Sequence, residues 1–121
     1  MLKKILVIED DEQVCSMLKI VLEEEGYAVI DAPNGKVGMR LYRENGADLV
    51  ITDLIMPEKE GIETIRELKR DNPNVKIIAM SGGGIIKPEE YLKIAERLGV
   101  QRTLTKPFKR EEILEAVSEL I

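Results

Sequence analysis

The side chains best suited to chemistry in this sequence are carboxylates, a hydroxyl and a lysine, and each follows a short apolar run. Glu9-Asp10-Asp11 follows residues 5–8, Asp53 follows residues 49–51, Ser81 follows residues 76–80, and Lys106 follows the segment around Leu104. If these runs are neighbouring parallel strands, carboxylates converge at one edge of a sheet. Like charges a few ångströms apart do not all stay ionised unless a cation joins them. Oxygen ligands without histidine or cysteine favour a hard ion such as Mg²⁺.

This set of side chains suits in-line phosphoryl transfer. Asp53 offers a nucleophilic carboxylate, Lys106 offers a mobile point charge for a phosphoryl oxygen, and Ser81 offers a hydroxyl donor. With a metal ion they supply an acceptor and the charge stabilisation that such a reaction requires. Each residue alone could have an ordinary structural role: the acidic residues as turn or helix caps, Ser81 as a loop hydroxyl and Lys106 as a solvated lysine. Their joint occurrence at four strand ends is what indicates a site.

The apolar pattern predicts the elements that position these residues. Continuous apolar runs indicate strands at residues 5–8, 28–32, 49–53 and 76–80, and a short strand around Leu104. Helical spacing indicates a helix between Asp11, a candidate N-cap, and Gly26, a candidate C-terminal stop. It indicates further helices over residues 35–44, around residues 62–68, over residues 88–98 and around residues 113–120. The residues 81–84 are expected to form a flexible loop. Five β–α units predict an α/β fold, with a parallel sheet and helices on both faces, and the pattern leaves the strand order open.

Composition and charge exclude several classes of protein. The 121 residues are expected to form one domain, residues 1–121, with 44% apolar and 34% charged residues. The net charge of −5 and the few aromatics argue against direct nucleic-acid binding, and no apolar run is long enough for a membrane span. A single cysteine, Cys15, and no cleavable leader predict a cytoplasmic protein. The absence of histidine excludes histidine bases, ligands and phosphohistidine donors.

Four motifs together resemble the signature of response-regulator receiver domains of two-component signalling, and the resemblance covers essentially the whole chain. They are residues 5–11 (Ile-Leu-Val-Ile-Glu-Asp-Asp), residues 53–57 (Asp-Leu-Ile-Met-Pro), Ser81, and Lys106-Pro107-Phe108. The likeness is to single-domain, chemotaxis-regulator-like receivers. It implies a doubly wound, five-stranded (βα)5 fold of the flavodoxin-like type, with strand order 2-1-3-4-5.

The resemblance also implies a role for each site residue. Asp53 would accept the phosphoryl group from a sensor histidine kinase or phosphotransfer protein, and Ser81 and Lys106 would contact that group. Mg²⁺, for which Mn²⁺ can substitute, would bind Asp10, Asp53 and the backbone carbonyl of Ile55 directly, and Glu9 through water. The protein would then be a phosphoacceptor that assists its own phosphorylation and dephosphorylation, and no enzyme in the usual sense. Its conformational switch would regulate a downstream protein target, and the Lys106-Pro107 bond would be cis.

Two departures from the family pattern concern the switch. Receivers usually carry an aromatic residue three positions before the lysine, and here that position is Thr103. Gly82 meets the family's preference for a small residue after Ser81, but further glycines, including Gly83, lengthen the loop. We therefore expect movement in residues 82–87, where it would hide or expose Ile85 and Ile86.

Three alternatives are weighed against this interpretation. A receiver-like interaction module that acts without phosphorylation would be favoured if Asp10, Asp53 or Lys106 were missing, and all are present. A phosphatase of the haloacid-dehalogenase type would need a second aspartate where Ile55 stands. A flavodoxin-like electron carrier would need glycine and hydroxyl residues after the first strand, where the acidic residues would repel a phosphate.

Overall fold

The computed structural model describes residues 2–54, 60–82 and 88–121, in which strands and helices alternate along the chain. The strands are β1 (Lys4–Ile8), β2 (Ala28–Ala32), β3 (Leu49–Asp53), β4 (Ile77–Ser81) and β5 (Arg102–Thr105). The helices are α1 (Glu12–Glu24), α2 (Gly35–Asn45), α3 (Glu60–Asp71), α4 (Pro88–Arg97) and α5 (Arg110–Leu120). This is the α/β alternation that the sequence predicts.

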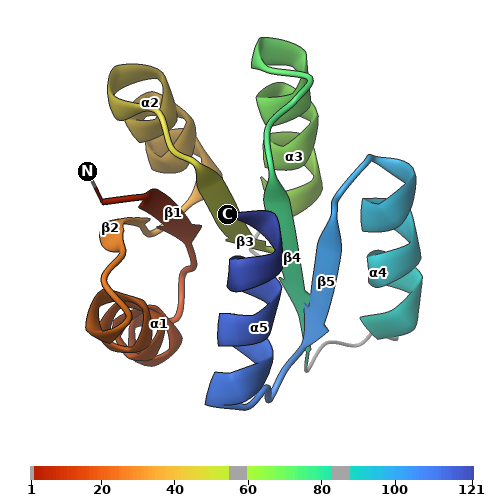
Figure 1. The fold of residues 1–121 in the computed structure, drawn as a ribbon. Helices are drawn as coiled ribbons and strands as arrows, with labels where there is room; N and C mark the ends of the chain where they lie inside the picture. Colours follow the sequence, from red (N-terminus) through yellow and green to blue (C-terminus); the bar gives the residue numbers. More distant parts are fainter. Residues whose placement is uncertain (1, 55–59, 83–87) are drawn as a thin grey trace.

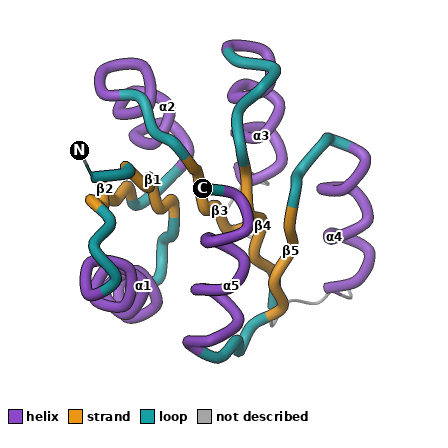
Figure 2. The backbone as a smooth tube through the Cα atoms, viewed as in Figure 1, coloured by secondary structure: helices purple, strands orange, loops and turns teal. Residues whose placement is uncertain are grey.

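The strands form one five-stranded parallel sheet in the order β2-β1-β3-β4-β5. Helices α1 and α5 cover one face, while α2, α3 and α4 cover the other (Figure 1). The tube view in Figure 2 shows the same three layers. The doubly wound fold and the strand order implied by the resemblance are both confirmed.

Strand β1 shows why these strands are continuously apolar. Ile5 and Val7 pack into the core beneath α1 and α5, and Leu6 and Ile8 pack into the core beneath α2 and α3. Successive side chains of a strand point to opposite faces, so a sheet covered on both sides needs apolar residues at every position. All four side chains are at most 1% exposed.

Local signals for the ends of helices hold in the structure. The Asp11 carboxylate accepts hydrogen bonds from the backbone amides of Gln13 (2.9 Å) and Val14 (3.3 Å), so Asp11 caps α1 as expected. Gly26 follows the end of that helix with a φ of +94°, a conformation that costs glycine least. Helix α2 ends one residue later than expected, at Asn45 rather than residue 44.

Strand β1 begins one residue earlier than predicted, at Lys4, and both boundaries of β4 differ from the prediction. Strand β4 begins at Ile77, not at Lys76, and it includes Ser81, which was expected in a flexible loop. Ser81 pairs with Thr105 of β5 and is completely buried, because the parallel ladder continues one residue beyond the apolar run. The predictions for Gly83, Ile85, Ile86 and the Ile55 carbonyl lie outside the described residues. None of the helices within the described ranges is long and apolar enough to cross a membrane.

Cys15 packs on the inner side of α1, as its spacing from Leu18 and Leu22 indicates. Its thiol donates to an Asp31 carboxylate oxygen at an Sγ–Oδ2 distance of 3.8 Å. Burial, followed by the nearby negative charge of Asp31, raises the pKa of the Cys15 thiol from 9.0 to about 11. The thiolate, which is the reactive form, is therefore scarce at neutral pH.

We expect native Cys15 to react with iodoacetamide at pH 8 on the order of 100-fold more slowly than the urea-unfolded chain, since two pKa units reduce the thiolate population about that much. Mass spectrometry of timed, quenched samples gives both rates, because the chain has one cysteine. Comparable rates in the folded and unfolded protein would show that the thiol is not shielded in this way.

Candidate functional site

The predicted site residues meet at the carboxyl edge of the sheet. Glu9 and Asp10 directly follow β1, Asp53 ends β3, Ser81 ends β4, and Lys106 directly follows β5. These strands are consecutive neighbours in the order β1-β3-β4-β5, so their ends lie side by side. Sheet pairing thus brings together residues that lie up to 97 positions apart in the chain.

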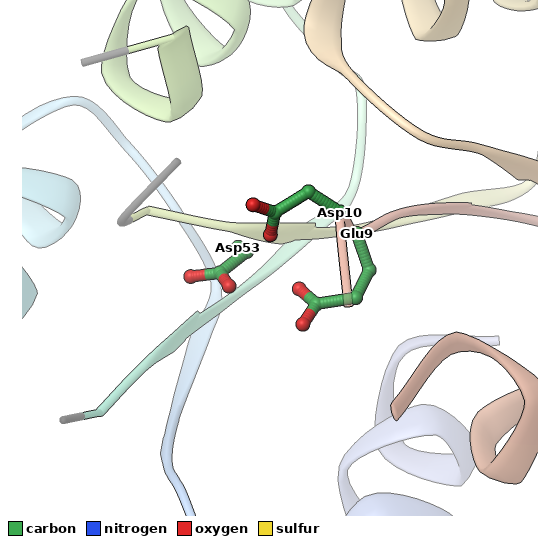
Figure 3. A group of neighbouring side chains, drawn as sticks. All are labelled: Glu9, Asp10 and Asp53. Carbon is green, nitrogen blue, oxygen red and sulfur yellow. The ribbon is translucent and has the colours of Figure 1, made fainter. Parts of the chain in front are cut away.

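Three carboxylates form a cluster at this edge. Glu9, Asp10 and Asp53 each offer an oxygen, and these oxygens all lie within 4.8 Å of one another. Figure 3 shows the three side chains extending toward a common space beyond the strand ends. Asp10 is exposed to solvent, whereas Glu9 and Asp53 are 2% and 4% exposed. Two negative charges are therefore buried together, which requires a nearby cation or a proton.

Lys106 supplies a cation from within the chain. Its Nζ donates to Glu9 Oε1 at 2.7 Å and to Asp53 Oδ2 at 2.8 Å, so one ammonium bridges the two buried carboxylates. The backbone holds the lysine in register, because the Lys106 amide donates to the Ser81 carbonyl at 2.7 Å. The Lys106-Pro107 peptide bond is cis, as the resemblance implies.

The pKa shifts follow from this burial and pairing. Burial, together with the hydrogen bond that Glu9 shares with Asp53, raises the pKa of Glu9 from 4.5 to about 8, although Lys106 acts against this rise. Burial also acts to lower the pKa of Lys106, but its hydrogen bonds to Asp53 and Glu9 outweigh that effect and raise it. The lysine therefore stays charged, and Glu9 takes up a proton at a higher pH than an ordinary glutamate does.

Two buried oxygen atoms at this edge have unused bonding capacity. Among the described residues, Glu9 Oε2 and Ser81 Oγ are buried without a hydrogen-bond partner. Native proteins satisfy nearly all buried polar atoms, so these two oxygens are positions where a bound ligand or a water would complete the hydrogen bonds. The oxygen-only carboxylate set and the orphaned Glu9 oxygen fit a hard divalent cation such as Mg²⁺.

Two of the five residues assigned to the switch, Thr103 and Gly82, lie among the described residues. Thr103 is half-buried in β5, where it pairs with Ala79 of β4. Gly82 follows β4 and lies so close to Lys106 that a Cβ on the glycine would approach the lysine Cβ to 2.7 Å. An apolar groove of about 370 Å³ adjoins this point and is lined by Val14, Met17, Gly82, Lys106, Pro107 and Phe108.

Sequence reasoning missed two neighbours of the acceptor position. The Thr52 hydroxyl donates to the Asp53 carbonyl at 3.2 Å from a fully buried position. Gly61, in the first turn of α3, lies against the backbone of Asp53 and Leu54. The glycine eight positions after Asp53 was a visible signal, but its purpose depends on where α3 docks.

The comparisons with known proteins identify the family. The family model for the response regulator receiver domain matches residues 5–118, and the chain belongs to this family of signalling proteins. Chemotaxis protein CheY of Halobacterium salinarum is 33% identical over 121 residues, which cover 100% of this chain and 98% of that protein. The Thermotoga maritima protein of the same name is 32% identical over 119 residues, covering 98% of this chain and 97% of its relative.

A solved structure shows the same similarity in three dimensions. The crystal structure of a response regulator receiver domain protein from Clostridium thermocellum matches with a TM-score of 0.91 and 32% identity. The match covers 99% of this chain and 94% of the other. The fold and the sequence motifs therefore agree that this is a CheY-like receiver domain.

The raised pKa of Glu9 predicts how stability depends on pH without metal. Between the ordinary value of 4.5 and about 8, the folded state binds more protons than the unfolded state. The free energy of unfolding in EDTA should therefore fall as pH rises through this window, by at most about 1.4 kcal/mol per pH unit for one proton.

Urea unfolding at a series of pH values measures this slope, and Glu9→Gln, which keeps the shape of the protonated side chain, should flatten it. Glu12→Gln, on an exposed glutamate of α1, is the control and should keep the wild-type slope. An unchanged slope in Glu9→Gln would mean that another group is responsible.

Proposed function

We propose that this receiver domain accepts a phosphoryl group on Asp53 in a Mg²⁺-dependent reaction. The donor is a phosphohistidine on a sensor histidine kinase or phosphotransfer protein, and the phosphorylated domain regulates a downstream protein target. The observation that carries the proposal is the Lys106 ammonium, 2.8 Å from the Asp53 carboxylate, in a cluster with the Glu9 and Asp10 carboxylates. Membership of the receiver family supports the same chemistry.

In the proposed reaction a carboxylate oxygen of Asp53 attacks the phosphorus, and the P–N bond to the donor imidazole breaks as the new P–O bond forms. The imidazole leaves with the bonding electrons and takes up a proton. Lys106 then binds a phosphoryl oxygen with the ammonium that neutralises Asp53 beforehand, and Ser81 can donate its hydroxyl to another. The orphaned Ser81 Oγ supports this role, because a phosphoryl oxygen would give that buried hydroxyl a partner.

Glu9, Asp10 and Asp53 are the described residues that would hold Mg²⁺, and Ile55 remains a predicted carbonyl ligand. When bound, the ion supplies positive charge that offsets the carboxylates and draws electron density from the phosphoryl group. The exposed position of Asp10 leaves the cluster open to solvent on one side, so the ion can keep several waters.

The proposed function first predicts that acetyl phosphate phosphorylates Asp53 when Mg²⁺ or Mn²⁺ is present. Intact-mass spectrometry should show one added phosphoryl group on the wild type and none on Asp53→Asn, whose amide is a poor nucleophile. Asp48→Asn is the matched control, since Asp48 lies just before β3, at the opposite edge of the sheet. Undiminished labelling of Asp53→Asn, or labelling of the wild type in excess EDTA, would falsify the proposal.

A second prediction separates metal binding from the response to phosphorylation. Asp10→Ala should weaken Mg²⁺ binding strongly and raise the free energy of unfolding in EDTA, because it removes like-charge repulsion. Lys106→Ala should keep most of the Mg²⁺ affinity, since it removes a cation rather than a ligand, yet impair the response to the phosphoryl group.

Isothermal titration calorimetry measures the Mg²⁺ affinity of the wild type and of both variants. Beryllofluoride, which stands in for the phosphoryl group, gives the response as changes in backbone amide NMR shifts. The two roles are not separate if both variants lose Mg²⁺ affinity to the same extent.

A further inference from the structure

The first turn of α3 lies in direct contact with the strand end that carries Asp53. Gly61 is the second residue of this helix and is buried. A Cβ placed on Gly61 would lie 2.3 Å from the Asp53 carbonyl oxygen, and 2.7 Å from both the Cα and the carbonyl oxygen of Leu54. Real Cβ atoms essentially never approach other heavy atoms within 3.0 Å. No residue larger than glycine therefore fits without moving one of the two segments.

The glycine is needed for space rather than for backbone conformation. Its φ lies outside the left-handed range, in contrast to Gly26, Gly46 and Gly99. Gly26 and Gly46 have open space where a Cβ would lie. Inside a helix alanine is ordinarily favoured over glycine, so local propensity argues against glycine at position 61. The close approach to residues 53 and 54 is the remaining reason for it.

The three atoms nearest to a Cβ on Gly61 cannot avoid it by rotating a side chain, because all three belong to the backbone. Helix α3 cannot easily withdraw either, since Ile65 and Leu68 are fully buried beneath it. On the other side, the Leu54 amide donates to the Met80 carbonyl at 2.8 Å, which ties the strand end to β4. A Cβ at position 61 would thus press on the backbone that carries the Asp53 carboxylate.

We propose that Gly61 is a positioning residue for the site. By letting α3 touch the β3 backbone, it sets where the Asp53 carboxylate lies relative to Lys106, at 2.8 Å, and to Glu9 and Asp10. Gly61 acts through Asp53 and has no chemical role of its own. The consequences for Mg²⁺ and for phosphorylation rest on the proposed function, whereas the consequence for the Asp53–Lys106 ion pair does not.

The test compares Gly61→Ala with two controls. Gly38→Ala also adds a methyl to a buried helix glycine on the same face of the sheet, but its Cβ would meet the Ile8 side chain, with Cδ1 at 2.5 Å, and this side chain can change rotamer. Val117→Ala removes buried side chain from α5 on the other face and serves as a control for lost stability. All variants are purified as the full chain and their folding is checked by circular dichroism.

Two readouts are independent of each other. Mg²⁺ titration and the acetyl phosphate labelling rate report on the proposed function, and we expect both to fall about tenfold or more in Gly61→Ala alone, because sub-ångström misplacement of reacting groups is costly. The second readout is the coupling between Asp53 and Lys106, measured in EDTA. It comes from urea unfolding of Asp53→Ala, Lys106→Ala and the double variant, with and without Gly61→Ala.

We expect a smaller Asp53–Lys106 coupling free energy in the Gly61→Ala background than in the wild type. The two controls, Gly38→Ala and Val117→Ala, should keep a Mg²⁺ affinity and a labelling rate close to those of the wild type. The proposal is overturned if the Asp53–Lys106 coupling is undiminished in the Gly61→Ala background. It is also overturned if Val117→Ala loses as much Mg²⁺ affinity as Gly61→Ala does. A Gly61→Ala protein that stays unfolded even with the stabilising osmolyte trimethylamine N-oxide also overturns it, since the glycine would then serve the fold. If the wild-type protein neither binds Mg²⁺ nor becomes labelled, the proposed function is wrong. The Asp53–Lys106 coupling, which needs neither Mg²⁺ nor phosphorylation, still decides the role of Gly61.

Discussion

One lysine ammonium shared by two buried carboxylates is the interaction on which the carboxyl edge of the sheet depends. Lys106 lies within 2.8 Å of both Glu9 and Asp53, whose side chains are 0% and 6% exposed. Removing one partner from such a buried set commonly costs about 3–5 kcal/mol, because a charge is left uncompensated. Three strand ends must therefore keep their relative positions for the charges to stay paired.

The rest of the fold provides that fixed frame. Strands β1 and β3 lie in the interior of the sheet with helices on both faces, so their ends are fixed by packing from both sides. Glycines bring the backbone close where side chains would intervene: Gly61 lies against Asp53, and Gly82 lies against Lys106. The charged groups are therefore positioned by backbone contacts as much as by their own attraction, which is what a reaction that depends on alignment needs.

In the proposed function, the same arrangement would link phosphorylation to a structural response. In the proposed reaction the phosphoryl group becomes a new partner for Lys106, an ammonium that bridges β1 and β3 in the structure described here. Lys106 also borders the apolar groove with Met17 and Phe108, so a change in its contacts would alter the edge of an apolar surface. Thr103, half-buried in β5, the strand that leads to Lys106, has no ring with which to follow such a change.

Local patterns in the sequence were sufficient to predict the elements, apart from some of their boundaries, and to nominate the site residues, whose chemical roles remain predictions. The apolar runs, the Asp11 cap and the Gly26 stop depend on neighbours within a few positions, so they could be read directly, and the strand order came from the family motifs. The burial of Ser81 in β4, the orphaned Glu9 oxygen, the lysine shared by Glu9 and Asp53, and the need for glycine at position 61 came from the tertiary structure alone. Each of these depends on the distance between segments that are remote in the chain, and that distance is set by how helices and strands pack.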